Sequence, residues 1–115
     1  MAYDEALAAR IRELVGGGAG VTEQTMFGGL AFLVDGNMAI AASGRGGVLV
    51  RVDPETTDEL VATTDARLME MRGRFMRGWV RVDAEDVADD EELVGWVERG
   101  IEYARSQPPK PTARR

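Results

Sequence analysis

Residues 25–41 read TMFGGLAFLVDGNMAIA, in which two apolar runs flank Asp35-Gly36-Asn37. Aspartate, glycine and asparagine tolerate the positive φ angles of a tight turn, and apolar runs on both sides of such a turn are typical of two antiparallel strands. The stretch therefore predicts one long β-hairpin. Gly28 and Gly29 lie inside its first arm, where glycine indicates either a bulge or the close approach of another backbone or a ligand.

A helix is predicted before the hairpin. Residues 3–15 carry apolar side chains at helical spacing, and the five small residues 16–20 (GGGAG) end that helix. A phosphate-binding loop would need a strand before it and a helix after it that begins with Gly-Lys-Ser or Gly-Lys-Thr. This run has no strand before it, no helix after it and no Gly-Lys-Ser or Gly-Lys-Thr at its end, so we interpret it as a connection to the hairpin.

Two further helices follow the hairpin. Asp53 and Pro54 form a helix start, as N-cap and first helical residue, and this short helix ends near Thr63. The acidic run 89–92 precedes a third helix, which ends before the prolines of residues 108–111. Acidic residues belong at the positive end of a helix, so we interpret this run as capping rather than as a carboxylate metal site.

Three more strands complete the pattern. Residues 48–52 form a third strand after the turn at residues 43–47, and residues 68–71 and 79–82 alternate as strands four and five around a turn at residues 72–73. The fold class is therefore α+β: two layers, with an antiparallel five-stranded sheet in the order helix, three strands, helix, two strands, helix.

One domain is expected over residues 1–107, with a disordered tail over residues 108–115. Such a sheet has one face covered by helices, and the other face can be wet. The strand 48–52 fits this alternation only in part, because Leu49 shares a side with Arg51. A sheet that is apolar on both faces would indicate a dimer contact.

The composition removes most catalytic chemistry. The 115 residues include no histidine and no cysteine, so Ser43 and Thr25 have no base to activate them, and the usual zinc ligands are missing. We expect no enzymatic activity, no catalytic residue, no metal and no cofactor. No apolar run approaches the roughly 20 residues that cross a bilayer, and the N-terminus is acidic, so we expect a cytoplasmic protein with no membrane contact.

Charge is distributed unevenly. The net charge is −6, which argues against direct, specific DNA binding, yet residues 67–82 hold five arginines against one acid. The segment 72–79 alternates arginine with aromatic residues, a composition that suits an anionic ligand or partner, or alternatively a strand edge protected from pairing. The candidate binding residues are the four in this segment and the two glycines of the hairpin: Arg72, Arg74, Phe75, Arg77, Gly28 and Gly29.

The methionines leave two alternatives open, and the tryptophans give one expectation about burial. Several methionines lie in or beside predicted strands, where they either fill the core or line an adaptable binding surface. We expect Trp79 and Trp96 to be substantially buried, one on the sheet and one on the third helix facing it.

The assembled pattern resembles the N-terminal domain of the TfoX/Sxy family. The resemblance covers nearly the whole chain, and its matching positions are the Met1-Ala2-Tyr3-Asp4 start, Met26-Phe27-Gly28-Gly29 with Phe32, Asp35-Gly36-Asn37-Met38, Arg51-Val52, Gly73-Arg74, Gly78-Trp79-Val80, Trp96 and Pro108-Pro109-Lys110. It implies a two-layer α+β domain. In longer members this domain belongs to regulators of natural competence that assist a cyclic-AMP-responsive transcription activator.

These observations predict a non-enzymatic interaction or regulatory module, a homodimer that acts through a protein partner. The alternative is a protein that binds a small anionic ligand or a nucleotide with the Gly28-Gly29 gap and the patch of residues 72–77.

Overall fold

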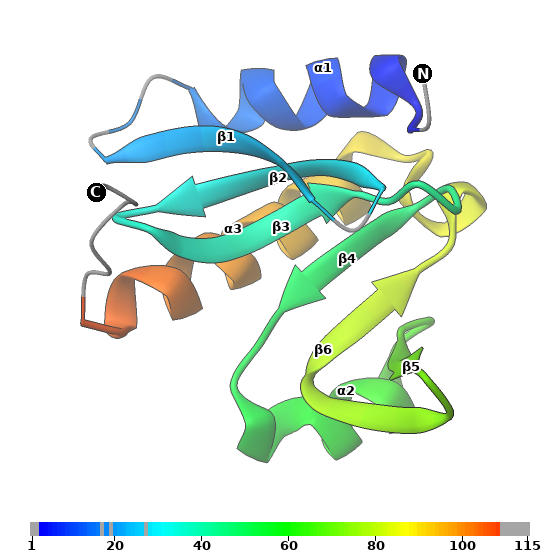
Figure 1. Cartoon of the computed structure of the whole chain (residues 1–115). Coiled ribbons are helices and arrows are strands. Elements are labelled where there is room, and N and C mark those ends of the chain that lie inside the picture. Colours follow the sequence, from blue (N-terminus) through cyan, green and yellow to red (C-terminus); the bar gives the residue numbers. More distant parts are fainter. Residues whose placement is uncertain (1–2, 17, 19, 27, 109–115) are drawn as a thin grey trace.

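The computed structural model describes residues 3–16, 18, 20–26 and 28–108. They form an antiparallel sheet of six strands with three α-helices, an α+β fold as predicted (Figure 1). The elements in chain order are α1 (Glu5–Val15), β1 (Val21–Met26), β2 (Gly29–Val34), β3 (Asn37–Ala42), β4 (Val48–Arg51), the 3₁₀ turn η1 (Pro54–Thr56), α2 (Thr57–Thr63), β5 (Arg67–Met71), β6 (Arg74–Val82), the 3₁₀ turn η2 (Ala84–Val87) and α3 (Asp90–Ser106).

The prediction of five strands is wrong, because the first arm of the hairpin is two strands. β1 runs antiparallel to β2, Met26 lies opposite Gly29, and Gly28 lies in the turn between the two strands. Gly28 has φ 74°, a value that suits glycine at such a turn. The polar sequence of residues 21–25 concealed β1, since it lies at the sheet edge with most of its side chains exposed. Phe27 lies outside the described residues.

The turn predicted at Asp35-Gly36-Asn37 is confirmed. Asp35 and Gly36 connect β2 to β3 with φ angles of 52° and 83°, the pattern of a type I′ turn. The aspartates at the predicted helix starts accept backbone N–H groups with their side chains, although the chain after Asp53 first forms a 3₁₀ turn and α2 begins only at Thr57. Asp4 caps α1, Asp53 caps η1 ahead of α2, and Asp89 caps α3. Of the tail predicted over residues 108–115, residues 109–115 lie outside the described residues.

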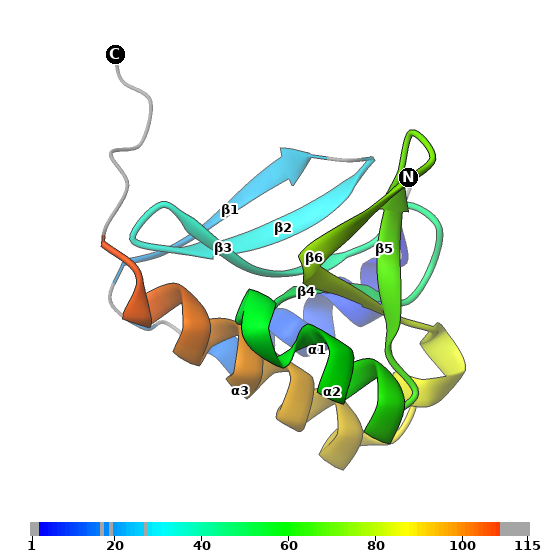
Figure 2. The ribbon, with the colours of Figure 1, turned by 90° about the horizontal axis from the view of Figure 1, so that it is seen from below.

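The strand order is β1-β2-β3-β4-β6-β5, and the helices α1, α2 and α3 lie along one face of the sheet (Figure 2). The main core lies between these layers, where Ile11 of α1, Phe32 of β2 and Leu93 of α3 are at most 2% exposed. Trp96 of α3 is also buried there, as expected.

β6 bends sharply near Gly78. Leu68 of β5 lies opposite Val80, whereas the next residue, Met69, lies opposite Met76. Residues 77–79 therefore bulge out of the pairing between β5 and β6. Gly78 donates its backbone N–H to the buried hydroxyl of Thr57, at 2.9 Å, which ties the bend to α2. In Figure 2 the turn between β5 and β6 projects on the side of the sheet that lies away from the helices.

Candidate binding surface

A second apolar cluster lies on the sheet face that points away from the helices. We call this side the open face. Its cluster consists of buried Ala31, Leu33, Ala41, Leu49 and Met69, with partly buried Met26, Met38 and Trp79 against them. In the part of the chain that the structure describes, no helix contributes a residue to it.

The open face explains the incomplete alternation of residues 48–52. Leu49 is only 3% exposed, although it lies on the side away from the helices. The central strands are thus apolar on both faces, and on the open face the chain's own side chains already bury Leu49. Trp79 also lies here rather than facing Trp96, so the expected pairing of the two tryptophans across one core is wrong.

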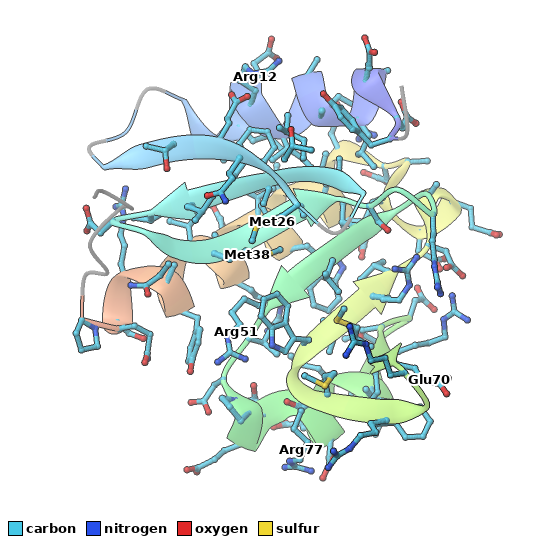
Figure 3. The ribbon with its side chains drawn as sticks, in the orientation of Figure 1. Arg12, Met26, Met38, Arg51, Glu70 and Arg77 are labelled. Carbon is cyan, nitrogen blue, oxygen red and sulfur yellow. The ribbon has the colours of Figure 1, made fainter. Side chains whose placement is uncertain are left out.

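The methionines serve both roles that the sequence left open. Met69 is 8% exposed and fills the second cluster, while Met26 and Met38 are only partly buried and line hollows of the open face. Figure 3 labels Met26 on β1 and Met38 on β3, the two strands that flank β2, and both side chains pack against the same cluster.

The first hollow has a volume of about 610 Å³ and lies between the β2–β3 turn, β4, β6 and the end of α3. Apolar side chains of Met26, Leu33, Met38 and Trp79 contribute to its wall. Its residues are Met26, Leu33, Gly36, Asn37, Met38, Arg51, Trp79, Tyr103, Ala104, Gln107 and Pro108.

Arg51 brings a positive charge into this first hollow. Its guanidinium carbon lies 5.0 Å from the ring centroid of Trp79 and 5.3 Å from that of Tyr103, and its Nη1 donates to the Gly78 carbonyl at 3.1 Å. Both ring distances are within the range of cation–π attraction. No carboxylate among the described residues forms an ion pair with Arg51.

The second hollow, about 330 Å³, lies farther along the open face and is rich in arginine. Among the described residues, Arg45, Arg72 and Arg81 line it together with one carboxylate, Glu70, and with apolar residues that include Met69. Its positive character contrasts with the net charge of −6 of the whole chain.

Arg81 occupies the most unfavourable position of the three arginines. Burial lowers its pKa below the ordinary arginine value, and repulsion from Arg45 and Arg67 lowers it further, while Asp83 acts in the opposite direction. Its guanidinium donates to Ser43 Oγ at 3.2 Å and to the Gly46 carbonyl at 3.3 Å, both neutral acceptors. An anion at this hollow would relieve the repulsion.

The structure brings only some of the predicted site residues together. Gly29 and Arg72 both line the second hollow. Phe75, which is 66% exposed, lines a neighbouring depression that shares Arg45 and Arg81.

The side chain of Arg77 points toward α2 and not into the second hollow. It donates to Asp58 Oδ2 at 2.9 Å and to the Pro54 carbonyl at 3.1 Å, beside α2 (Figure 3). Arg74 is exposed at the start of β6 and does not line the second hollow.

The close approach that glycine indicated at residues 28 and 29 is made by the chain itself. A Cβ atom on Gly29 would overlap the Ala42 carbonyl oxygen, and one on Gly44 would overlap the Gly28 carbonyl oxygen. Backbone therefore occupies the space beside Gly29, whereas a Cβ atom on Gly28 would meet nothing within 4 Å.

Sequence reasoning missed Arg45, Arg51 and Arg81 as site residues. A signal for two of them was present, since Leu49 and Arg51 alternate on β4 in the same way as Trp79 and Arg81 on β6. The antiparallel pairing of β4 with β6 places Leu49 opposite Arg81, and Arg51 opposite Trp79. Without the strand order, these residues could not be assigned to one surface.

The fold and this surface define a small α+β domain whose antiparallel sheet is covered by helices on one face and carries an apolar, arginine-lined surface on the other. The family model described as TfoX N-terminal domain matches residues 13–104. The chain belongs to this family, as the resemblance implied. A comparison with curated proteins gave no match. Among the described residues, no helix has both the length and the apolar character needed to cross a bilayer.

Proposed function

We propose that this protein is a non-enzymatic interaction module of the competence-regulator type, which binds an acidic protein partner on its open face. The observation that supports this most strongly is the second apolar cluster, which lies on the sheet face opposite the helices. The inner residues of this cluster are buried, whereas Met26, Met38 and Trp79 at its margin stay partly accessible. Accessible apolar surface bordered by polar groups is typical of sites that bind other proteins.

The charge of the second hollow supports an acidic partner. Three arginines and one glutamate line it, and Arg81 has a lowered pKa because of burial and of repulsion by Arg45 and Arg67. Carboxylates of a partner would offset this repulsion, and the arginine fork binds carboxylates in two-point contacts.

The methionines support a partner whose contact surface is apolar as well as acidic. Met26 and Met38 are partly buried and border the hollows. Methionine has three rotatable bonds and a polarizable sulfur, so such side chains can adapt to an incoming apolar group. An amphipathic acidic segment would meet both the methionines and the arginines.

A second copy of the chain is a less suitable occupant of the open face. Two copies that met face to face would bring their arginines together, and like charges across an interface oppose association. The expected homodimer therefore stays a prediction that requires a different surface.

We also propose, from the family, that the protein acts in the cytoplasm and affects transcription through its partner rather than by contacting DNA.

The test is affinity capture from the native host, identification of the captured protein by mass spectrometry, and measurement of its binding to purified variants. Met26→Asp places a charge on the open face, and Leu14→Asp is the matched control, because Leu14 is 41% exposed on α1. We expect Met26→Asp to abolish binding and Leu14→Asp to leave it unchanged. Equal loss, or no loss, in both variants would contradict the assignment to the open face.

A further inference from the structure

The first hollow forms where the sheet opens. β3 and β4 pair over Ile40, Ala41 and Ala42 only, so Met38 and Arg51 lie beyond the paired region (Figure 1). The end of α3 closes this opening from the helix side with Tyr103 and Ala104. The result is a hollow that has an apolar wall on the open face and reaches toward the helix layer.

The C-terminal end of α3 is fixed at this hollow by the β2–β3 turn. Asn37 Nδ2 donates to the Pro108 carbonyl at 2.9 Å and to the Ala104 carbonyl at 3.3 Å. These bonds hold Tyr103 beside Arg51 and occupy the Asn37 amide. The hollow is therefore largely formed before any ligand enters, which is usual for small-molecule sites.

The guanidinium of Arg51 has N–H donors available for an anion. The group has five N–H donors, of which the described structure uses one, toward the Gly78 carbonyl. Cation–π attraction to the rings of Trp79 and Tyr103, at 5.0 and 5.3 Å, holds the guanidinium in the hollow. Arg51 is the one charged side chain among the described residues that line this hollow.

We propose that this hollow binds a small apolar monocarboxylate, with the carboxylate on the edge of Arg51 and the apolar body against Met26, Leu33 and Met38. The volume of about 610 Å³ is within the usual range for small-molecule sites. A single planar guanidinium matches one carboxylate in a two-point contact. A doubly charged phosphate would lack a second cation there. Met26 borders both hollows, but the cations differ, since Arg51 lines only the first hollow and Arg45 and Arg72 line only the second. The proposal can therefore be tested apart from the protein partner.

The experiment titrates decanoate, and separately its neutral counterpart decanol, into the full chain by isothermal calorimetry. We expect saturable decanoate binding at one site, and decanol binding that is at least about 10-fold weaker, because it lacks the charge that Arg51 contacts. Arg51→Gln should weaken decanoate binding about 10- to 100-fold, the effect of losing a hydrogen bond to a charged group, and leave decanol binding unchanged. Arg77→Gln is the matched control, because Arg77 contacts Asp58 outside the hollow and should bind as the parent does.

A second variant keeps the proposal testable if Arg51→Gln fails to fold. Met38→Trp fills the hollow from a partly exposed position and should weaken decanoate binding by at least about 10-fold without changing the melting temperature. No saturable decanoate binding to the parent, equal binding of decanoate and decanol, or undiminished decanoate binding by Met38→Trp would each overturn the proposal. Loss of partner capture together with unchanged decanoate binding in one variant, Arg45→Glu combined with Arg72→Glu, would show that the two surfaces act separately, because these arginines line only the second hollow.

Discussion

Gly100 of α3 packs directly on the backbone carbonyl of Ala39 in β3, so closely that a Cβ atom at position 100 would overlap the Ala39 oxygen. The helix that closes the first hollow is thereby held against the sheet by a contact between backbones. Gly95 lies earlier in the same helix, and a Cβ atom there would point into open space, with no atom of another element within 4 Å. The two glycines therefore differ in what a methyl group would meet.

Gly100→Ala should destabilise the protein by about 1–3 kcal/mol, the usual cost of forcing extra volume into a packed site. Gly95→Ala should stabilise it by about 0.5–1 kcal/mol, because alanine favours the helix interior over glycine. Urea denaturation of both variants measures the difference. If Gly100→Ala is as stable as Gly95→Ala, α3 does not approach β3 as closely as the structure indicates.

Trp96→Ala should cost about 3–5 kcal/mol, the range for removing a packed large aromatic side chain. Trp96 is 5% exposed in the main core, whereas Trp79 is only partly buried on the open face. Trp79→Ala should therefore destabilise the protein less than Trp96→Ala does. Thermal denaturation ranks the two variants, and the reverse order would contradict the separation of the two clusters.

The contact between Arg12 and Glu23 makes part of the stability dependent on pH. Arg12 Nε and Nη2 donate to the two carboxylate oxygens of Glu23 at 2.6 and 2.9 Å, and this hydrogen bonding lowers the pKa of Glu23. The lowered pKa means that the contact stabilises the fold above the ordinary glutamate pKa, and that this stability is lost as the pH falls through the lowered value. The effect is small, since both side chains are partly exposed.

Glu23→Gln should thus lower the urea midpoint near neutral pH, and the difference from the parent should vanish in strong acid. Glu13→Gln, an exposed position on the same helix as Arg12, is the control and should show no such pH-dependent difference. A difference for Glu23→Gln that persists in strong acid would assign the effect to packing rather than to charge.

Local sequence signals predicted the helices and turns of this fold because their causes are local. Asp4 and Asp89 cap helices with their own side chains, and Asp35-Gly36 turns the chain through its own backbone angles. β1 was missed because an exposed edge strand with the sequence VTEQTM has no apolar alternation to reveal it. The partner strand β2 supplies its hydrogen bonds, and that pairing cannot be read from one segment.

The candidate surface depends on contacts between distant segments, so the sequence predicted it only in part. Arg72 and Gly29 are among the predicted residues and do line one hollow, but Arg45 and Arg81 reach it from other elements. Arg77 was grouped with Arg72 because they are close in the chain. The bend at Gly78 and the ion pair with Asp58 direct Arg77 toward α2 instead.

The protein should show no specific affinity for duplex DNA on its own. Its net charge is −6, and the first turn of α3 carries Asp90, Glu91 and Glu92, so it offers no basic recognition helix among the described residues. Fluorescence anisotropy with a random duplex at moderate ionic strength measures this. Sub-micromolar affinity that weakens steeply with added salt would contradict the prediction.

Charge reversal separates the arginines that form the proposed partner surface from those that do not. Arg45→Glu combined with Arg72→Glu reverses two of the three cations of the second hollow and should abolish capture of the acidic partner. Arg74→Glu combined with Arg77→Glu is the matched control, since Arg74 is exposed outside the hollow and Arg77 pairs with Asp58. Both double variants should melt close to the parent temperature, because exposed charges contribute little to stability. Loss of capture in the second double variant alone would support the surface of residues 72–77 that the sequence predicted, and capture that survives both reversals would place the partner on another face.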